Sequence, residues 1–202
     1  MRSRLVHREE LRRPALECAP WLLGKLICRG DVVLRITELE AYCGPADTAA
    51  HTSKGRTPRN EPMWGEPGHA YIYLCYGIHN LVNVVCADVG QGEACLVRSC
   101  EVLEGLETVT VRRGGRRGPV LLTGPGKVGQ ALGLTTALSG HDLLTAGELE
   151  LRDALPVRDI LAGPRVGVDY ASAEHREAPW RFAVAGTRWV SVATTLRPLS
   201  RT

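Results

Sequence analysis

The chain is poor in aromatic residues, with four Trp, five Tyr and one Phe among 202 residues. It also lacks an uninterrupted apolar run: its most apolar long window, residues 70–87, contains His79, Asn80 and Asn83, which argues against a membrane span. A net charge of +3 is too small to indicate an anionic partner by itself. The length and the 44% hydrophobic content predict one soluble enzyme or binding domain with a substantial core.

Closely spaced cysteine pairs are missing, although the chain has seven cysteines. No CxxC pair and no secretory leader is visible, so reduced thiols in an intracellular protein are favoured over a disulfide framework. Most cysteines lie in apolar runs such as LLGKLIC and NVVCA, where cysteine behaves as a small hydrophobic residue. The six histidines are scattered without ligand spacing, so we expect neither a metal nor a cofactor.

A nucleotide-triphosphate loop is excluded at GPGK. The pattern GxxxxGK[ST] requires Gly at position 121 and Ser or Thr at 128, where the chain has Leu121 and Val128. TGPGKVGQALGL instead predicts a helix entered through Gly-Pro. Free amides at such a helix start, with Lys127 beside them, also suit a DNA phosphate, and the residues leave both interpretations open.

The first third of the chain predicts a short helix in ALECAPWLLG and then a hairpin around the RGD triplet. Along its second strand, Glu38, Glu40 and Tyr42 share one face, while Leu39 and Ala41 occupy the other. The acids belong either to a solvated edge or to a half-buried site, where desolvation raises a carboxyl pKa toward that of a general base. The residues alone do not rank the two acids.

Residues 43–69 form a connection rich in Gly, Pro and polar residues, far longer than most loops. Loops of this size in compact domains are functional or disordered. His51 lies in this loop between two tyrosine-bearing strands, so it is either a surface histidine or part of a site.

The stretch AYIYLCYGIHN holds three of the five tyrosines within six positions. Alternation places Tyr71, Tyr73 and Cys75 on one face of a strand, and Tyr76 falls where Gly77 permits a turn. This concentration indicates either a tyrosine-lined core strand or a platform of rings for stacking against a flat ligand.

The rest of the chain shows no repeat and no linker, so residues 1–202 are predicted to form a single domain. EVLEGLETV has helical spacing, and RVGVDY and RFAVAGTRWVSV predict strands. Residues 1–14 form a basic arm with the composition of a mobile segment, and RRGGRRG is a flexible cationic loop. Both are either non-specific phosphate contacts or solvated charge.

Five motifs occur in the order ELEAYCGPADTAAH, TPRNEPMWGEPGHAYIYLCYGIHNLVNVV, EACLVRSCEVLEG, TGPGKVGQALGL and PRVGVDY. Together they closely resemble the alkyladenine (3-methyladenine) DNA glycosylase family, from about Leu16 to Val192. The resemblance implies an α+β fold: a single mixed domain around a curved antiparallel sheet, with a protruding hairpin that enters the DNA minor groove.

The resemblance also implies roles for individual residues. Tyr76 corresponds to the tyrosine that intercalates and fills the space left by an extruded nucleotide. Tyr73 and Tyr42 correspond to rings that sandwich the flipped base, and His51 packs and hydrogen-bonds at the pocket wall. Asn83 corresponds to the residue that crowds the exocyclic amine of guanine, and the His51 main-chain amide to the donor that reads the purine 6-position.

Glu40 matches the catalytic carboxylate of the family, and Arg98 and the Val168 carbonyl match groups that hold the attacking water. Glu38 has no match. The implied reaction is monofunctional: Glu40 activates water against the sugar C1′ and leaves an abasic site, with no lyase step, in base excision repair. The roles of Met63, Trp64 and His79 are not settled by the motifs, and we expect them at the pocket or minor-groove wall.

The implied partner is double-stranded DNA containing damaged purines: 3-methyladenine, 7-methylguanine, hypoxanthine or ethenoadenine. We expect a monomer without membrane attachment, located in the cytoplasm (nucleoid) of a bacterium or in the nucleus or a DNA-containing organelle of a eukaryote. Three alternatives stay open: a non-catalytic damage-binding protein that uses Tyr76 as a wedge, a mainly helical helix-hairpin-helix glycosylase, and a metal- or nucleotide-dependent enzyme.

Overall fold

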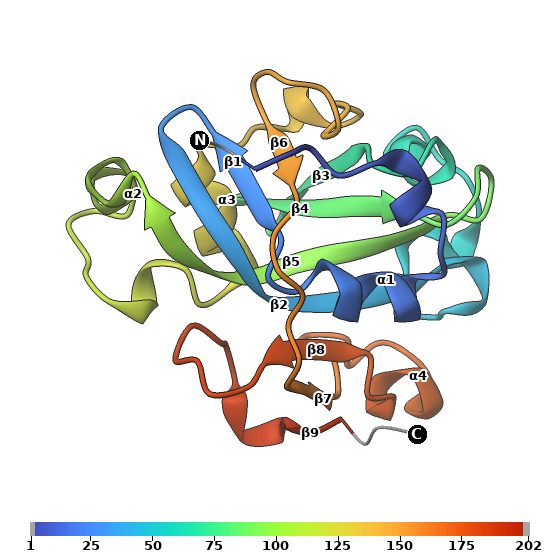
Figure 1. Ribbon diagram of the computed structural model, residues 1–202. Helices are drawn as coiled ribbons and strands as arrows, with labels where there is room; N and C mark the ends of the chain where they lie inside the picture. The colour runs from blue at the N-terminus through green and yellow to red at the C-terminus, as the bar shows by residue number, and fades with distance from the viewer. Residues whose placement is uncertain (1–2, 200–202) are drawn as a thin grey trace.

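The two longest strands, β2 (Val32–Cys43) and β5 (Glu93–Glu104), pair along nearly their whole length and form the centre of the molecule (Figure 1). In this computed structural model, which describes residues 3–199, they belong to a curved antiparallel sheet of nine strands. The strand order is β3-β4-β5-β2-β8-β7-β9, and β1 pairs with both β2 and β6. The predicted α+β class, one mixed domain around a curved antiparallel sheet, is therefore confirmed.

The remaining elements are short. The other strands are β1 (Leu26–Arg29), β3 (Ala70–Cys75), β4 (His79–Cys86), β6 (Glu150–Arg152), β7 (Ile160–Gly163), β8 (Arg181–Val184) and β9 (Arg197–Pro198). The α-helices are α1 (Ala15–Leu22), α2 (Leu106–Arg112), α3 (Pro125–Leu132) and α4 (Ala173–Glu177). Single 3₁₀ turns are η1 (Arg8–Leu11), η2 (Gly44–Ala46), η3 (His51–Lys54), η4 (Glu61–Trp64), η5 (Pro119–Leu121), η6 (Thr136–Leu138) and η7 (Ala193–Thr195).

Two hairpins occupy the positions that the sequence predicts. β1 and β2 meet at the RGD triplet, where Gly30 has a φ of 59°. β3 and β4 meet at a tight turn in which Tyr76 (φ 51°) and Gly77 (φ 72°) both lie in the left-handed region. The Ile78 amide donates to the Cys75 carbonyl at 3.1 Å and closes this turn. Tyrosine is strained there, so the turn holds Tyr76 at a backbone cost that glycine would avoid.

The pairing of β2 with β5 is irregular beside the two predicted acids. Ile36 pairs with Cys100 and Glu38 with Ser99, but Leu39 pairs with Val97. One residue on each strand is thus left out of the ladder, Thr37 on β2 and Arg98 on β5. Such bulges redirect side chains and are common next to active sites.

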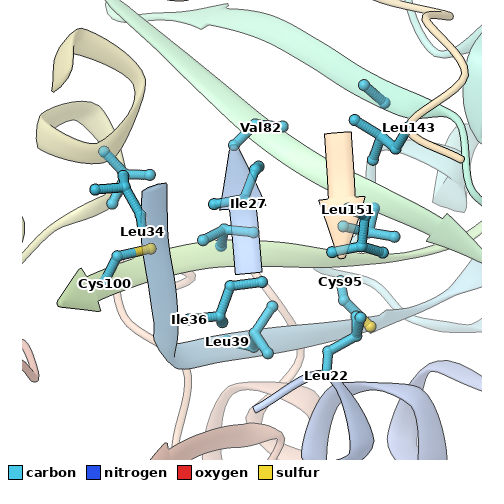
Figure 2. Packing of buried hydrophobic residues seen from close by; sticks show 14 of the residues in the cluster. Leu22, Ile27, Leu34, Ile36, Leu39, Val82, Cys95, Cys100, Leu143 and Leu151 are labelled. Carbon is cyan, nitrogen blue, oxygen red and sulfur yellow. The ribbon is translucent and has the colours of Figure 1, made fainter. Parts of the chain in front are cut away.

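The faces of the sheet differ in what they bury. The main core gathers side chains from many elements, and Figure 2 shows Leu22 of α1, Ile27 of β1 and Leu39 of β2 pointing into it. A separate small cluster, Met63, Tyr71, Val85 and Ala94, lies on the other side of β3, β4 and β5. Val85 and Ala94 directly neighbour the core residues Cys86 and Cys95, as alternation along a strand requires.

Helix α3 packs closely on strand β4. A Cβ atom at Gly129 would lie 1.8 Å from the carbonyl oxygen of Asn80, so only glycine allows this approach. The side chain of Asn80 donates to the Leu134 carbonyl at 2.8 Å, just past the end of the helix. The β3–β4 hairpin is therefore fixed to α3 close to its turn.

The basic N-terminal arm packs against the body of the protein from Ser3 onward; residues 1 and 2 lie outside the described part of the chain. Val6 and Leu11 are buried in the main core, and the Val6 amide donates to the Leu151 carbonyl. Arg4 forms ion pairs with Glu10 and Asp153. Much of the arm's charge is thus used within the chain, which the composition could not show.

Two local predictions were wrong. EVLE of EVLEGLETV continues strand β5, because Gly105 (φ 75°) separates this strand from α2. RVGVDY is a loop, and RFAVAGTRWVSV contributes only the strand β8. In neither case is the apolar run buried as a whole: Leu103 of EVLE is 50% exposed, and in RVGVDY Val168 is buried whereas Tyr170 is 70% exposed.

Within residues 3–199, the longest α-helices have eight residues, and none of these helices has the length and apolar character needed to cross a membrane. A mainly helical fold of the helix-hairpin-helix kind is excluded, because the sheet forms the framework and the helices are short. The loop 43–69, expected to be functional or disordered, folds as three 3₁₀ turns with Asp47, Thr52 and Asn60 buried.

Candidate active site

A pocket of about 290 Å³ opens beside the β3–β4 hairpin. Its walls come from β2, β3, β4 and the loop 43–69, with one residue from the loop after β7. The lining residues are Tyr42, Ala49, His51, Met63, Tyr71, Tyr73, Asn83 and Tyr170.

Rings form one wall of the pocket. Tyr71 and Tyr73 stack with ring centroids 5.4 Å apart, and His51 meets the Tyr73 ring edge-on at 4.6 Å. The His51 Nδ1 and the Tyr71 hydroxyl are hydrogen-bonded at 2.8 Å. Burial, followed by the nearby charge of Arg59, lowers the pKa of His51 below its usual value. The imidazole is therefore neutral at neutral pH and leaves the wall uncharged.

Asn83 forms part of the opposite strand of the hairpin and is buried. It pairs with Tyr71 across β3 and β4, and its Nδ2 donates to the Tyr71 carbonyl at 3.0 Å. This bond fixes the orientation of the amide plane at the pocket wall. A fixed amide is able to discriminate between ligands because it cannot rotate to suit each of them.

Glu40 lies behind the pocket, completely buried on β2. Its Oε2 accepts a hydrogen bond from the Tyr42 hydroxyl at 3.0 Å, and its Oε1 accepts one from the Val166 amide at 2.7 Å. Arg98 Nη1 lies 3.2 Å from the same Oε1. Donors from three different segments thus orient this carboxylate toward the pocket side of β2.

The protonation of Tyr42 and Arg98 follows from their surroundings. Burial, and then the negative charge of Glu40, raise the pKa of Tyr42 well above its usual value, so its hydroxyl keeps its proton and donates it. Burial would lower the pKa of Arg98, but the charges of Glu40 and Glu38 outweigh it, and the pKa is raised. Arg98 is a permanent cation beside Glu40.

Glu38, which has no counterpart in the motifs, is the most heavily hydrogen-bonded acid of the site. It is fully buried, and its oxygens accept bonds from Arg181 Nη1 at 2.7 Å, Ser99 Oγ at 2.6 Å and the Ser191 amide at 2.7 Å. Arg98 Nε lies 3.6 Å from Glu38 Oε1. Glu38 therefore sits behind Arg98 and joins β2, β5, β8 and the loop at Ser191.

A second buried ion pair supports the loop that follows β7. Arg165 binds both oxygens of Asp47, at 2.5 and 2.8 Å, and donates to the Ala41 carbonyl at 2.9 Å. Its guanidinium also packs over the rings of Tyr42 and Trp180, 4.8 and 4.9 Å from their centroids. Arg165 thus packs on one face of the Tyr42 ring. Its fixed position also places the next residue, Val166, for the hydrogen bond to Glu40.

Tyr76 lies outside the pocket, at the tip of the hairpin, with 87% of its surface exposed. Ile78 next to it is 72% exposed. His79 pairs with Cys75 directly beside the turn, and a Cβ at Gly126 would lie 2.7 Å from its ring, so His79 packs against the start of α3. Lys127 is nearby on α3, and burial, then Arg113 and Arg116, lower its pKa. Exposed rings and clustered cations thus share this end of the molecule.

The structure brings most of the predicted site residues together. Tyr42, His51, Tyr73 and Asn83 line one pocket, Met63 lies in its wall, and Glu40 and Arg98 are in contact behind it. His79 and Lys127 lie apart from the pocket. Val168 is buried against Tyr42, and its carbonyl accepts a bond from the Ala171 amide at 2.9 Å.

Three lining residues were not predicted: Ala49, Tyr71 and Tyr170. The alternation of β3 already placed Tyr71 on the face of Tyr73, so the signal for Tyr71 was present in the sequence. Tyr170 comes from a distant loop, and its hydroxyl donates to the Ala49 carbonyl at 2.9 Å. No sequence pattern connects these two segments.

Comparison with known proteins agrees with this geometry. The family model described as methylpurine-DNA glycosylase (MPG) matches residues 9–188. A protein of Arabidopsis thaliana named "DNA-3-methyladenine glycosylase" is 55% identical over 188 residues, covering 92% of this chain and 74% of its own. A protein of Nitrosococcus oceani named "Putative 3-methyladenine DNA glycosylase" is 55% identical over 186 residues, covering 92% of both. One of Methanocella arvoryzae with the same name is 47% identical over 175 residues, covering 84% and 87%.

The structure thus combines a buried acid, a pocket walled by rings and a hairpin that exposes a tyrosine. The chain belongs to the methylpurine-DNA glycosylase family. It is accordingly a hydrolase of N-glycosyl compounds whose substrate is DNA and whose process is DNA repair by base excision.

Proposed function

We propose that the chain is a monofunctional DNA glycosylase that flips damaged purines out of duplex DNA and hydrolyses the N-glycosidic bond with water activated by Glu40. The damaged purines are 3-methyladenine, 7-methylguanine, hypoxanthine and ethenoadenine, and the product is an abasic site. The observation that carries the proposal is the buried carboxylate of Glu40, bonded to the hydroxyl of the pocket residue Tyr42 at 3.0 Å.

Glu40 acts as general base and as a charge. It takes a proton from water as the oxygen attacks the sugar C1′, and its negative charge stabilises the oxocarbenium-like centre that forms, as carboxylates do in glycoside hydrolysis. Arg98 and the Val166 amide hold one carboxylate oxygen. Because these donors fix the carboxylate, little reorganisation is needed when the charge on the sugar develops. The Val168 carbonyl retains a second lone pair and helps to hold the water.

The rings select the base. A purine alkylated at N3 or N7 is cationic, and a cation over a tyrosine face gains about 0.5 to 2 kcal/mol, depending on desolvation. Tyr73 with its neutral partner His51 on one side and Tyr42 on the other provide faces for such a base. Neutral lesions such as hypoxanthine lack this attraction, so we expect the pocket to accept both kinds of base to unequal degrees.

Asn83 and His51 exclude normal purines from the pocket. The Asn83 amide, fixed by its bond to Tyr71, crowds the exocyclic amine of guanine. The His51 main-chain amide donates to an acceptor at the purine 6-position, and adenine presents an amine there. A clash and an unpaired donor both act against normal bases, which outnumber lesions in any duplex.

Tyr76 fills the gap that the flipped nucleotide leaves. Extrusion costs roughly a few kcal/mol, least for damaged or mispaired bases, and an inserted ring offsets part of this cost by stacking. Full exposure at the tip of a tight turn suits a wedge. His79 lies beside the turn of the same hairpin and Lys127 lies on α3, which packs against it, so both reach the phosphates beside the flipped nucleotide.

The test is single-turnover base release from duplex oligonucleotides that carry ethenoadenine, hypoxanthine or 3-methyladenine. Replacing Glu40 with Gln should lower the rate by about 10²- to 10⁴-fold, the usual contribution of a general base, while lesion binding is retained. Glu104→Gln, the same change at an exposed position of β5, is the matched control and should release base at the wild-type rate.

The outcomes separate the candidates. Equal rates for wild type and Glu40→Gln would remove Glu40 from the mechanism. Binding to lesion-containing duplexes without release of any of the three bases would leave a damage-binding protein that uses Tyr76 as a wedge.

A further inference from the structure

Three of the seven cysteines meet in the core, although they are far apart in the sequence. The Sγ atoms of Cys18 on α1, Cys86 on β4 and Cys95 on β5 all lie within 4.8 Å of one another. Each side chain is at most 1% exposed. The sequence lacks the close cysteine pairs of zinc sites, so only the packing of α1 against the sheet reveals this cluster.

The cluster lies on the opposite side of the strands from the pocket. Cys86 and Cys95 belong to the main core, whereas their neighbours Val85 and Ala94 face Tyr71 and Met63. Figure 2 shows the Cys95 sulfur beside Leu22, above α1. The three thiols are therefore no part of the proposed base-release chemistry, and an inference about them does not depend on that function.

We propose that Cys18, Cys86 and Cys95 form a three-thiolate binding site for a soft monovalent metal ion of the copper(I) type. Thiolates are the ligands that such ions prefer. Three sulfurs arranged around one ion, with metal–sulfur bonds of about 2.3 Å, lie about 4 Å from one another. The Sγ–Sγ distances in the cluster are at most 4.8 Å, so each needs to shorten by less than about 1 Å.

The number of ligand atoms at the cluster favours copper(I) over zinc. Within residues 3–199, no fourth His, Cys, Asp or Glu donor joins the three sulfurs within the same mutual distance. Structural zinc sites are almost always four-coordinate, and hard ions require oxygen ligands. Three sulfurs in an apolar core suit trigonal copper(I) better than zinc.

Three thiolates and one copper(I) ion give the loaded site a net charge of −2, which is costly in an apolar core unless a cation lies nearby. On binding, three thiol protons pass to solvent as three sulfur–copper bonds form, and copper stays in the +1 state. The resulting site carries a net negative charge. Arg13, which precedes α1, lies near enough to Cys18 to act on it electrostatically and offsets part of that charge.

A bound ion would add metal–sulfur bonds between elements that already pack together: β4 and β5 are paired in the sheet, and α1 lies against them. The Cys95 thiol donates to the Ala15 carbonyl at 3.7 Å, and Glu93 accepts the Ala15 amide at 2.6 Å, so the start of α1 already lies on β5. Copper would add a direct bond from α1 to β4 and to β5. Because the unfolded chain cannot present the three sulfurs together, binding stabilises the folded state.

The experiment is anaerobic titration of the reduced, full-length protein with copper(I) in competition with a chromophoric copper(I) chelator. All proteins carry Cys43→Ala and Cys75→Ala, which remove the two less buried thiols. We expect one equivalent of copper per chain, a higher unfolding temperature with copper, and loss of more than about tenfold in affinity for Cys18→Ala or Cys95→Ala. Cys100→Ala, buried at another place in the core, should behave as the parent protein (Figure 2).

Copper K-edge absorption of the loaded parent protein keeps the test valid if a variant fails to fold. Three sulfur neighbours at a single distance, with no nitrogen or oxygen neighbour, support the proposal. No uptake against the chelator, uptake that survives in Cys18→Ala, or a nitrogen- or oxygen-coordinated ion would each overturn it. Preference for zinc over copper(I) at the same three cysteines would overturn the choice of metal.

Discussion

The two faces of the central strands differ in how their side chains are held, although both faces belong to the same backbone. On the pocket side, β2 presents Glu38, Glu40 and Tyr42. Glu38 and Glu40 accept hydrogen bonds from other segments, and the Tyr42 hydroxyl donates to Glu40 on the same strand. On the core side, β2 presents Leu39 and Ala41, and contact area replaces directed bonds. The comparison teaches that the site is built by hydrogen bonds and charges on a platform that is stabilised from behind by apolar packing.

If this difference holds, a substitution on the polar face should lower the unfolding free energy by leaving a charged or hydrogen-bonding group without its partner. A substitution on the apolar face should lower it in proportion to the side-chain volume that is removed. The largest effect is expected at Glu38. Glu38→Gln leaves Arg181 fully buried without its anion, and breaking a buried pair in this way costs about 3–5 kcal/mol. Denaturant unfolding, monitored by circular dichroism, measures this loss.

The control for Glu38 is Glu101→Gln on the neighbouring strand. Glu101 pairs with Arg35 at 3.7 Å, and both side chains are about one-third exposed, at 33% and 38%. Exposed pairs contribute about 0–1 kcal/mol, so this variant should be nearly as stable as the wild type. Similar losses for the two variants would mean that burial does not set the strength of these ion pairs.

The apolar face is tested at Leu22, which is fully buried on α1. Leu22→Ala should cost about 2–5 kcal/mol of stability, because it removes buried volume and leaves a cavity. At a temperature where the variant is folded, base release per folded molecule should equal that of the wild type. A rate that falls further than the folded fraction would show that the two faces are not independent.

Tyr76 should show the reverse pattern, an effect on DNA without an effect on stability. Tyr76→Asn removes the ring but suits the left-handed conformation at φ 51°. We expect binding to lesion-containing duplexes to weaken by about 1–3 kcal/mol, the usual contribution of one stacked aromatic ring. Tyr76→Phe keeps the ring and should bind as the wild type does; a comparable loss in Tyr76→Phe would assign the effect to the hydroxyl and contradict a stacking role.

The smallest effect concerns pH and His51. Because the pKa of His51 is lowered in the folded protein, the unfolded chain binds more protons than the folded one below about pH 6.5, the ordinary histidine value. Its contribution to stability is therefore complete above that pH and decreases as the pH falls. His51→Gln should flatten the dependence of the unfolding free energy on pH between about 7.5 and 5.5. An unchanged slope for His51→Gln would refute the assignment.

Much of the fold was predictable because its signals are local. The helix α1, the hairpin at the RGD triplet and the turn at Tyr76 follow from apolar spacing and from turn-forming residues, and all three are observed. The alternation that places Glu40 and Tyr42 on one face is observed too. The predictions failed at RVGVDY and at EVLE, where long-range contacts bury apolar residues in a loop or extend a strand beyond its local preference.

The candidate site was predictable only in part. The motif resemblance identified Glu40, Tyr73 and Asn83, which the structure brings to one pocket or next to it. It left Glu38 without a role, although Glu38 holds Arg181 and lies behind Arg98. Bulges in β2 and β5 create this arrangement, and a bulge depends on the partner strand, which the sequence of either strand alone does not describe.

By itself, the sequence determined the short-range features of this protein: the strands and turns, the tyrosine-rich hairpin, and which side chains share a face. Tertiary structure alone decided which of these faces meet. It joined Tyr170 to Ala49, Arg165 to Asp47, and the cysteines of α1, β4 and β5 to one another. The physical reason is that the periodicity of side chains and the preferences of turn-forming residues act over a few residues. The burial of side chains and the pairing of strands act between segments that only the folded chain brings together.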